Sequence, residues 1–482
     1  MEKNKKSFLK NTIVVLISNV IALLSGVMIG FIIPRIMGVS EYGYYKTFTL
    51  YSSYISLLHF GFIDGIYLKY AGCKYESLDK TKFRCYTLFL FGFEAIITLL
   101  VLIPPLFFLK SDYSLVVLFI CLNILATIIS GYFELISQAT MRFGRTALRH
   151  VVKSALNVVS VLILLLLYLF NGLVVYSYIY IAVVLAINYS VAAWYAITYK
   201  DIIFGKRASF SSIKGDLFLF FKIGLPLLLS NLIAQIVFIV DQQFVNVAFD
   251  NETYSVYAFA YNMISLITIA TSAVATVLYP TLRTLNKESV ANNYSKLNTY
   301  LLVFVSVCLS SYYPLVFVVE HFLPDYIGSL DVLRIILPGV LISSSISVVK
   351  YNCYKTFGKI NNYFFKALFV LALSVVADLC VYFVFKNTLS ISMISIAVLL
   401  VWYFLVEHYF IKEHRVAWVR NALFIFVVLA AFYGISFVPN IYVGFGLYLC
   451  FSIAASFFFF RKTITDFLKS IRKKDDSSNV TN

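Results

Sequence analysis

The feature that most constrains this chain is a series of long apolar stretches. The hydrocarbon core of a bilayer is about 30 Å thick, and a helix of roughly 20 apolar residues crosses it. Fourteen stretches of the sequence meet this requirement, so we predict an all-α membrane protein with fourteen transmembrane helices. Their expected limits are 11–36, 44–70, 86–108, 114–138, 149–170, 173–198, 218–248, 254–280, 297–319, 329–353, 363–385, 390–411, 418–438 and 441–460.

The composition excludes a soluble fold of this size. Hydrophobic residues make up 61% of the chain and charged residues only 13%, with a mean hydropathy of +0.88. A typical soluble domain has about 25% charged residues. The seven cysteines include no CxxC pair, so the sequence predicts neither a disulfide framework nor a metal site.

The net charge of +16 is distributed by loop rather than gathered in one patch. Basic residues concentrate at the amino terminus, in every second loop and in the tail. The intervening loops hold only Arg35, Lys110 and Lys386. Because Lys and Arg favour cytoplasmic loops, this alternation predicts that both termini lie in the cytoplasm. It also indicates that nucleic acid is not the partner that this charge serves.

The chain contains a weak internal repeat. Residues 18–22 (SNVIA) match residues 230–234 (SNLIA) at an offset of 212 residues, and Lys10 faces Lys222 in the same register. The offset covers six spans, so the two halves have the same orientation. We predict two pseudo-symmetric six-helix lobes with a cavity between them, followed by two accessory helices and a basic cytoplasmic tail. The expected boundaries are 1–212, 213–414 and 415–482.

Five short motifs carry a resemblance to a known family. They are PRIMGVSEYG at 34–43, GFIDG at 61–65, GLPL at 224–227, ILPG at 336–339 and YKTFGK at 354–359. Over its first twelve spans the chain resembles the polysaccharide flippases of the multidrug/oligosaccharidyl-lipid/polysaccharide exporter superfamily. The resemblance implies two pseudo-symmetric lobes, alternating access and export of polyprenyl-pyrophosphate-linked glycans.

Basic residues inside the spans are the candidate substrate-binding groups. A pyrophosphate-linked sugar cannot cross hydrocarbon cheaply, but a hydrated cationic cavity would shelter its head. The candidates near the cytoplasmic ends of spans are Lys69, Lys153, Lys222, Lys350 and Lys366. Lys46 and Arg334 lie near outer ends and could draw the head outward. The alternative for each lysine is that it only reaches the headgroup region.

Acidic residues inside the spans are candidates for ion coupling. Asp64, Glu94, Asp241 and Asp378 lie in apolar stretches, where a carboxylate is costly unless it is paired, hydrated or protonated. Coupling to protons or sodium is one interpretation, with Asp241 the first candidate. The other is that each carboxylate is the charge partner of a lysine.

Helix-breaking residues also lie in the spans. Pro34, Pro226 and Pro338 are candidate gating positions, where a kink could let a helix bend. For the glycine pairs, such as Gly61 and Gly65, we favour close packing of helices, because small residues let backbones approach.

Together these features predict a flippase of undecaprenyl-pyrophosphate-linked oligosaccharide units in O-antigen, capsule or other surface-polysaccharide assembly. A multidrug or cation exporter of the same superfamily is one alternative, and it would favour an acidic, aromatic cavity. A peptidoglycan-precursor flippase is another. A membrane glycosyltransferase, polymerase or ligase is disfavoured, because it would need a large outer loop for its chemistry. We therefore expect no catalytic residue.

The same hypothesis predicts the localisation, partners and cofactors of the protein. We expect a multi-pass protein of the bacterial cytoplasmic (inner) membrane that contacts membrane lipids and the lipid-linked oligosaccharide. Polysaccharide polymerase and chain-length machinery are candidate partners. No cofactor is expected beyond a coupling ion.

Overall fold

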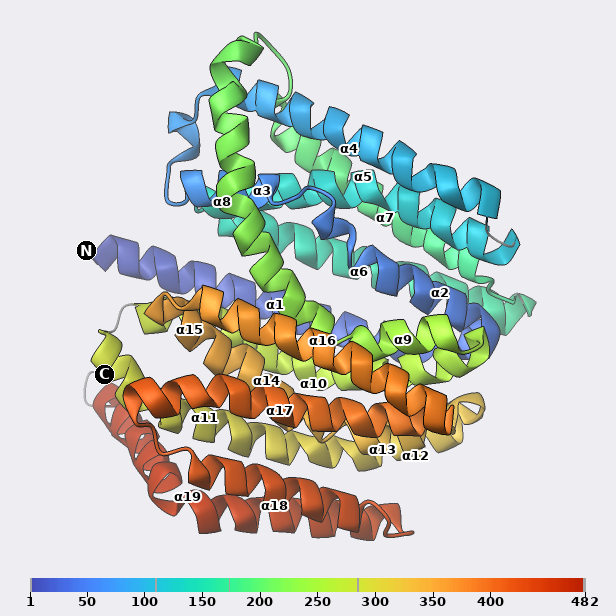
Figure 1. Ribbon diagram of the computed structural model, residues 1–482, viewed down its shortest axis with the longest axis vertical. Coiled ribbons are helices and arrows are strands. Elements are labelled where there is room, and N and C mark those ends of the chain that lie inside the picture. The colour runs from blue at the N-terminus through green and yellow to red at the C-terminus, as the bar shows by residue number, and fades with distance from the viewer. Residues whose placement is uncertain (1, 109–110, 173, 284–285, 480–482) are drawn as a thin grey trace. The chain divides into compact units, whose positions relative to one another are not determined.

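The computed structural model describes residues 2–108, 111–172, 174–283 and 286–479 (Figure 1). Every regular element in this part of the chain is helical, which confirms that the protein is all-α. Lys110 lies outside the described residues. Contacts group the chain into two compact units, Met1–Ala258 and Phe259–Asn482.

The first unit contains nine α-helices and the start of a tenth among its described residues. They are α1 (Glu2–Met37), α2 (Val39–Ser52), α3 (Phe62–Tyr70), α4 (Lys80–Phe108), α5 (Ser111–Ala139), α6 (Phe143–Asn171), α7 (Ser177–Thr198), α8 (Phe210–Val237), α9 (Val240–Ala248) and α10 (Asn251–Arg283). Helix α1 packs along α6, and α5 packs between α4 and α7.

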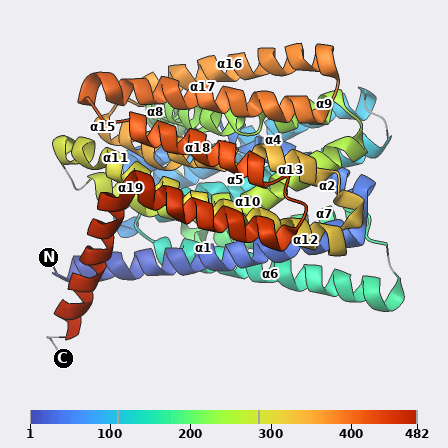
Figure 2. The same cartoon turned by 90° about the horizontal axis from the view of Figure 1, so that it is seen from below.

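The second unit holds the rest of α10 and the helices that follow. They are α11 (Lys287–Cys308), α12 (Tyr312–Phe322), α13 (Ser329–Ile336), α14 (Gly339–Ser344), a π-helix (Ser345–Lys350), α15 (Tyr351–Phe357), α16 (Ile360–Phe385), α17 (Thr388–His414), α18 (Val419–Ile435) and α19 (Ile441–Asn479). Figure 2 shows α16 and α17 lying side by side.

Ten described helices are long and apolar enough to cross a membrane, or eleven if the bent pair α13 and α14–α15 is one span. The protein is therefore a multi-pass membrane protein. A helix lies at each of the fourteen predicted stretches, but several do not form one long helix. The second stretch is broken between Ser53 and Gly61, and α18 has only 17 residues. The count of fourteen crossings and the cytoplasmic termini stay predictions.

Large apolar side chains on the outside of these helices fit a lipid environment. Phe170 on α6 is 81% exposed, and Phe383 on α16 is 72% exposed. In water such surfaces would be unfavourable, since burial of apolar area stabilises by about 25 cal/mol per Å². Lipid acyl chains would cover them instead.

Glycines bring α3 and α8 into backbone contact. A Cβ atom on Gly224 would overlap the carbonyl oxygen of Gly61, and one on Gly65 would overlap the carbonyl oxygen of Phe220. Gly61 also has a φ of 80°, which favours glycine. The close-packing interpretation is thus confirmed for these glycines. The contact groups α8 with the first unit and lets α8 run at a steep angle to α4 and α5 (Figure 1). The predicted lobes 1–212 and 213–414 stay a prediction.

Candidate functional site

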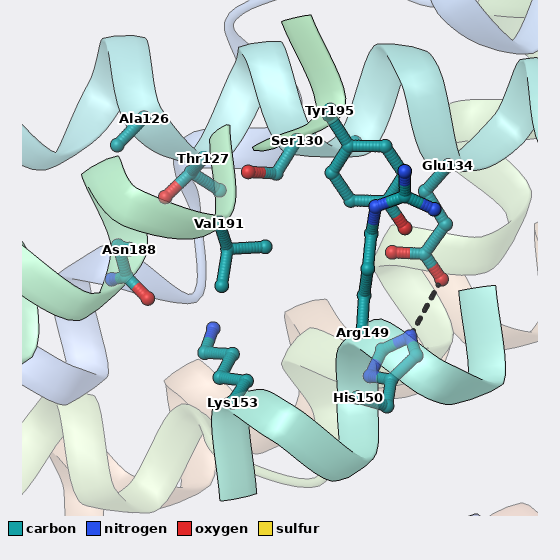
Figure 3. A pocket seen from close by; sticks show the side chains of 11 residues that line it. Ala126, Thr127, Ser130, Glu134, Arg149, His150, Lys153, Asn188, Val191 and Tyr195 are labelled. Carbon is teal, nitrogen blue, oxygen red and sulfur yellow. Dashed lines mark hydrogen bonds and ion pairs between the residues drawn. The ribbon is translucent and has the colours of Figure 1, made fainter. Parts of the chain in front are cut away.

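A pocket of about 210 Å³ opens among α5, α6 and α7 of the first unit (Figure 3). Its lining residues recur at helical spacing, so each helix presents one face to it. They are Ala126, Thr127, Ser130, Gly131 and Glu134 from α5, Arg149, His150 and Lys153 from α6, and Asn188, Val191 and Tyr195 from α7. Small residues on α5 leave the space open: a Cβ atom on Gly131 would meet nothing within 4 Å.

Arg149 forms the buried wall of the pocket. Its side chain is 4% exposed, and its guanidinium carbon lies 4.1 Å from the centre of the Tyr195 ring. One terminal nitrogen donates to Thr198 Oγ1 at 2.6 Å and the other to the Arg145 carbonyl at 3.0 Å. Nε has no hydrogen-bond partner among the described residues. These contacts hold the positive charge in a fixed orientation.

Lys153 supplies the second positive charge, and Figure 3 shows its amine on the pocket side of α6. It makes no ion pair or hydrogen bond with any described residue. Glu134, the one carboxylate in the lining, is instead 3.0 Å from His150 Nε2. The pocket therefore carries an excess of positive charge and an amine free to bind.

The pocket also offers an acceptor. Asn188 donates from Nδ2 to Asn123 Oδ1 at 3.0 Å, and its own Oδ1 has no partner among the described residues. A drug-sized ligand occupies a pocket of about 300–1,000 Å³. A pocket of this size and charge suits a single phosphate or sugar unit, with cations for the anionic oxygens and an amide oxygen for a hydroxyl.

Lys69 lies at the end of α3 in an ion-pair cluster rather than in this pocket. Its amine is 2.6 Å from Asp216 on α8, and Lys82 of α4 is 3.5 Å from the same carboxylate. The Tyr86 hydroxyl also donates to Asp216. Lys222, six residues further along α8 than Asp216, is exposed.

The other charged candidates of the first unit each contact aromatic or polar side chains. The Lys46 amine sits over the rings of Tyr42 and Tyr45, at 5.1 and 5.8 Å from their centres. Asp241, at the start of α9, is 3% exposed and accepts a hydrogen bond of 2.9 Å from Tyr257. The site residue Asp64 on α3 lies 3.8 Å from His59 Nε2.

Glu94 is the most isolated carboxylate of the first unit. It lies on α4 with no exposed surface, and neither of its oxygens has a hydrogen-bond partner among the described residues. Such a group costs free energy wherever it is buried in apolar surroundings. The geometry agrees with the prediction of a costly intramembrane acid.

In the second unit, Lys350 is sealed in a polar cluster. It ends the π-helix, has no exposed surface, and its amine lies 2.8 Å from Glu407 on α17. Ser345 accepts a further hydrogen bond from it at 2.8 Å, and the Tyr294 hydroxyl donates to Glu407 at 2.6 Å. Lys350 is thus paired with a carboxylate from another helix.

The two other basic candidates of the second unit donate hydrogen bonds to tyrosine hydroxyls, and its acidic candidate is buried. Lys366 donates to the Tyr354 hydroxyl at 3.0 Å, and Arg334 donates from Nε to the Tyr312 hydroxyl at 3.1 Å. Asp378 is fully buried on α16.

The three prolines occupy different kinds of position. Pro34 lies in the last turn of α1 and Pro226 inside α8. Pro338 lies between α13 and α14, where the chain bends by 44°. The bend agrees with a proline kink. Gating at these positions stays a prediction.

Sequence reasoning missed two parts of the first unit. Arg149, the first residue of the predicted span 149–170, was not named as a candidate, yet it lies inside α6 one turn before Lys153. The four-residue spacing of these two cations on one helix face was the available signal. Asp216 lay just before the predicted start of a span, and nothing in the sequence paired it with Lys69. Of the seven predicted basic residues, the pocket contains Lys153 alone.

Comparison with known proteins decides the family. A family model described as "Polysaccharide biosynthesis protein" matches residues 8–286, more than half of the chain. The chain belongs to this family. A search of curated protein sequences finds no match to this polysaccharide biosynthesis protein.

Solved structures show the fold of this family member. "Lipid II flippase MurJ, inward closed conformation" has a TM-score of 0.67 at 15% identity, covering 95% of this chain and 100% of that one. An inward-facing multidrug resistance MATE family transporter of the MOP superfamily has a TM-score of 0.54 at 14% identity, covering 85% and 95%. A MOP superfamily transporter from Pyrococcus furiosus Vc1 has a TM-score of 0.53 at 13% identity, covering 86% and 97%. The resemblance drawn from the motifs is confirmed.

Proposed function

We propose that this polysaccharide biosynthesis protein is a flippase that carries polyprenyl-pyrophosphate-linked oligosaccharide units from the cytoplasmic to the outer leaflet of the bacterial inner membrane. The observation that carries the proposal is that the Lys153 amine and the buried Arg149 guanidinium line one pocket, in apolar helices of a member of this family. Cations held in a pocket inside membrane helices lower the cost of bringing an anionic head out of water.

The transport cycle follows from the physics of the substrate. The pyrophosphate and sugars need a hydrated, cationic path, while the polyprenyl tail can stay in lipid throughout. Alternating exposure of that path to the two sides moves the head without making or breaking a covalent bond. The family and the fold that the chain shares with MurJ and with the MATE transporter support this cycle.

The proposal includes the finer predictions from the sequence. We propose fourteen crossings with both termini in the cytoplasm and two lobes of six helices. We also propose proton or sodium coupling at Asp241 or Glu94. Surface-polysaccharide polymerase and chain-length proteins are its expected partners. O-antigen, capsule and related glycans are the expected products.

Deletion of the gene followed by leaflet-resolved lipid analysis tests the function. We expect undecaprenyl-linked units to accumulate on the cytoplasmic leaflet, and wild-type protein to restore their transfer. If the units reach the outer leaflet at the normal rate and only polymer length changes, the proposal is wrong. If transfer is normal and cells instead lose resistance to cationic drugs, the exporter alternative replaces it.

A further inference from the structure

The second unit contains a groove that the proposed function does not use. It has a volume of about 810 Å³ and lies among α11, the first turns of α18 with the segment before them, and the middle of α19. We call it the C-terminal groove, defined by Lys296, Thr299, Arg420, Asn421, Leu423 and Phe458 with their neighbours. It lies outside residues 8–286, the part of the chain that the family model matches.

The charge of the C-terminal groove has one sign. Lys296 of α11 and Arg420 of α18 line it, and no carboxylate does. Both side chains are exposed, and neither makes an ion pair or hydrogen bond with any described residue. The alternation of basic loops predicts that this end of the unit lies on the cytoplasmic side, where anionic headgroups attract basic residues.

The polar groups at the base of the groove are already paired. Thr299 Oγ1 donates to Asn421 Oδ1 at 3.0 Å, and Ser295 Oγ donates to the Ala417 carbonyl at 3.1 Å. These bonds fasten α11 to α18 and to the segment before it. They leave few groups to read sugar hydroxyls, so a ligand would be recognised by its charge and its apolar part.

One wall of the groove is apolar and open. Phe458 is 84% exposed, and Leu423 is 51% exposed. At Phe460 the backbone of α19 leaves the helical range, with φ −130° and ψ 23°. The end of α19 then turns away from the line of α18, as Figure 2 shows. The bend sets apolar rings beside two cations at the expected membrane surface.

We propose that the C-terminal groove binds an anionic phospholipid of the cytoplasmic leaflet. The phosphate lies between Lys296 and Arg420, and an acyl chain packs on Phe458 and Leu423. Basic pockets between helices on the cytoplasmic side bind anionic headgroups in this way. A small soluble anion would gain nothing from the apolar wall. This inference does not depend on the proposed transport activity.

The test is a lipid titration of the purified full chain in detergent, followed by native mass spectrometry. Phosphatidylglycerol is the anionic probe and phosphatidylcholine the neutral one. We compare wild type with K296Q/R420Q and with the matched control K412Q/R415Q. The control removes the same charge from exposed residues around the end of α17 that do not line the groove.

We expect K296Q/R420Q to bind phosphatidylglycerol about 30-fold more weakly, because each basic residue near an anionic surface contributes roughly a factor of five. Phosphatidylcholine binding and the control should change by less than about twofold. Equal loss in the control, or no loss in K296Q/R420Q, would overturn the site.

Two further arms keep the result decisive. F458S keeps both charges, and because the Phe458 side chain is exposed we expect this variant to fold. Phosphatidylglycerol binding should weaken, because the acyl chain loses its contact with the ring. Unchanged binding contradicts the proposed packing of the acyl chain on Phe458. Undecaprenyl pyrophosphate is titrated in parallel. If it binds at the groove and phosphatidylglycerol does not, the occupant is the carrier lipid and the phospholipid proposal is wrong. Neither result bears on whether the protein transports the carrier.

Discussion

Lys153 and Lys350 are both lysines in apolar helices, and the sequence predicts the same role for each. The structure gives them opposite surroundings. Lys153 lines an open pocket with no partner among the described residues, whereas Lys350 has no exposed surface and lies 2.8 Å from Glu407. An intramembrane lysine can thus be available to an anion or already neutralised by the protein, and only its surroundings decide which.

The difference has a local cause in each unit. On α5, Gly131 and Ser130 leave a space opposite Lys153, and Glu134 is engaged by His150 instead. In the second unit the π-helix ending at Lys350 packs against α17 and α11. Burial of two opposite charges is tolerated only when geometry and hydrogen bonds compensate for lost hydration. Ser345, Tyr294 and Tyr403 surround the pair and supply such contacts.

The largest expected effect is on the sealed pair. Glu407→Gln removes the countercharge and leaves the Lys350 ammonium buried, so we expect a loss of about 3–5 kcal/mol in the free energy of unfolding. Melting of the detergent-solubilised protein would measure it. Glu413→Gln, an exposed position on the same helix, is the control. The double variant Lys350→Met/Glu407→Leu should recover most of the loss. A single variant as stable as wild type would contradict the account of a buried pair.

Asp216 provides an intermediate case, since its side chain is 19% exposed and it pairs with Lys69 and Lys82. Asp216→Asn should cost roughly 1.5–3 kcal/mol, the usual worth of hydrogen bonds to a charged group. The same melting assay applies, with Glu252→Gln as the exposed control. A loss of unfolding free energy larger than that of Glu407→Gln would contradict the expectation that a more deeply buried charge is costlier to leave without its partner.

Lys153→Gln should separate function from stability. Because the substitution leaves no described residue without an ion-pair or hydrogen-bond partner, we expect a change below about 0.5 kcal/mol in unfolding free energy, as at ordinary surface sites. Transfer of lipid-linked units in the deletion strain should fall about tenfold, equivalent to about 1.4 kcal/mol of binding. Lys206→Gln, an exposed loop residue, is the control. Normal transfer with Lys153→Gln would remove the pocket from the transport path.

The smallest expected effect concerns an ion pair outside the spans. Burial raises the pKa of Asp201, but hydrogen bonds from Tyr75 and Lys80 lower it more, so this pKa lies below its ordinary value. A carboxyl whose pKa is lowered by folding stabilises above its unfolded pKa of about 3.9, and the gain is lost as the pH falls further. With its side chain 43% exposed, the gain should stay below about 1 kcal/mol.

Wild type and Asp201→Asn should therefore differ slightly in melting temperature near pH 6, and the difference should vanish as the pH falls through the acid range below about 4. A difference that grows toward low pH would contradict the sign of the shift. Together with the Glu407 and Asp216 variants, this measurement ranks three charges by exposure.

Much of the fold could be predicted because the signal is local. Apolar stretches long enough to span lipid predicted helices, and a helix lies at each of them. The glycine spacing at Gly61 and Gly65 predicted close packing, which the contact with α8 confirms. The breaks inside predicted spans could not be read, since the 44° bend at Pro338 and the interruption after Ser53 depend on how neighbouring helices pack.

The candidate site was less predictable. Lys153 was named from its depth in a span, but Arg149 and Glu134 were not joined to it, because Arg149 lies at the edge of the predicted span and Glu134 comes from another helix. The partner of Lys350 was 57 residues away, and no spacing rule links such positions. Which charges pair depends on how the helices pack, and the hydropathy of the sequence carries no information about that packing.

The sequence by itself determined that this chain is a helical membrane protein and to which family it belongs. The length of an apolar stretch and the residues of a motif can both be read from neighbouring positions in the chain. Only the tertiary structure decided which buried charges are neutralised and which face a pocket. The physical reason is that the cost of a charge in a low-dielectric interior depends on atoms a few ångströms away, and those atoms come from other helices.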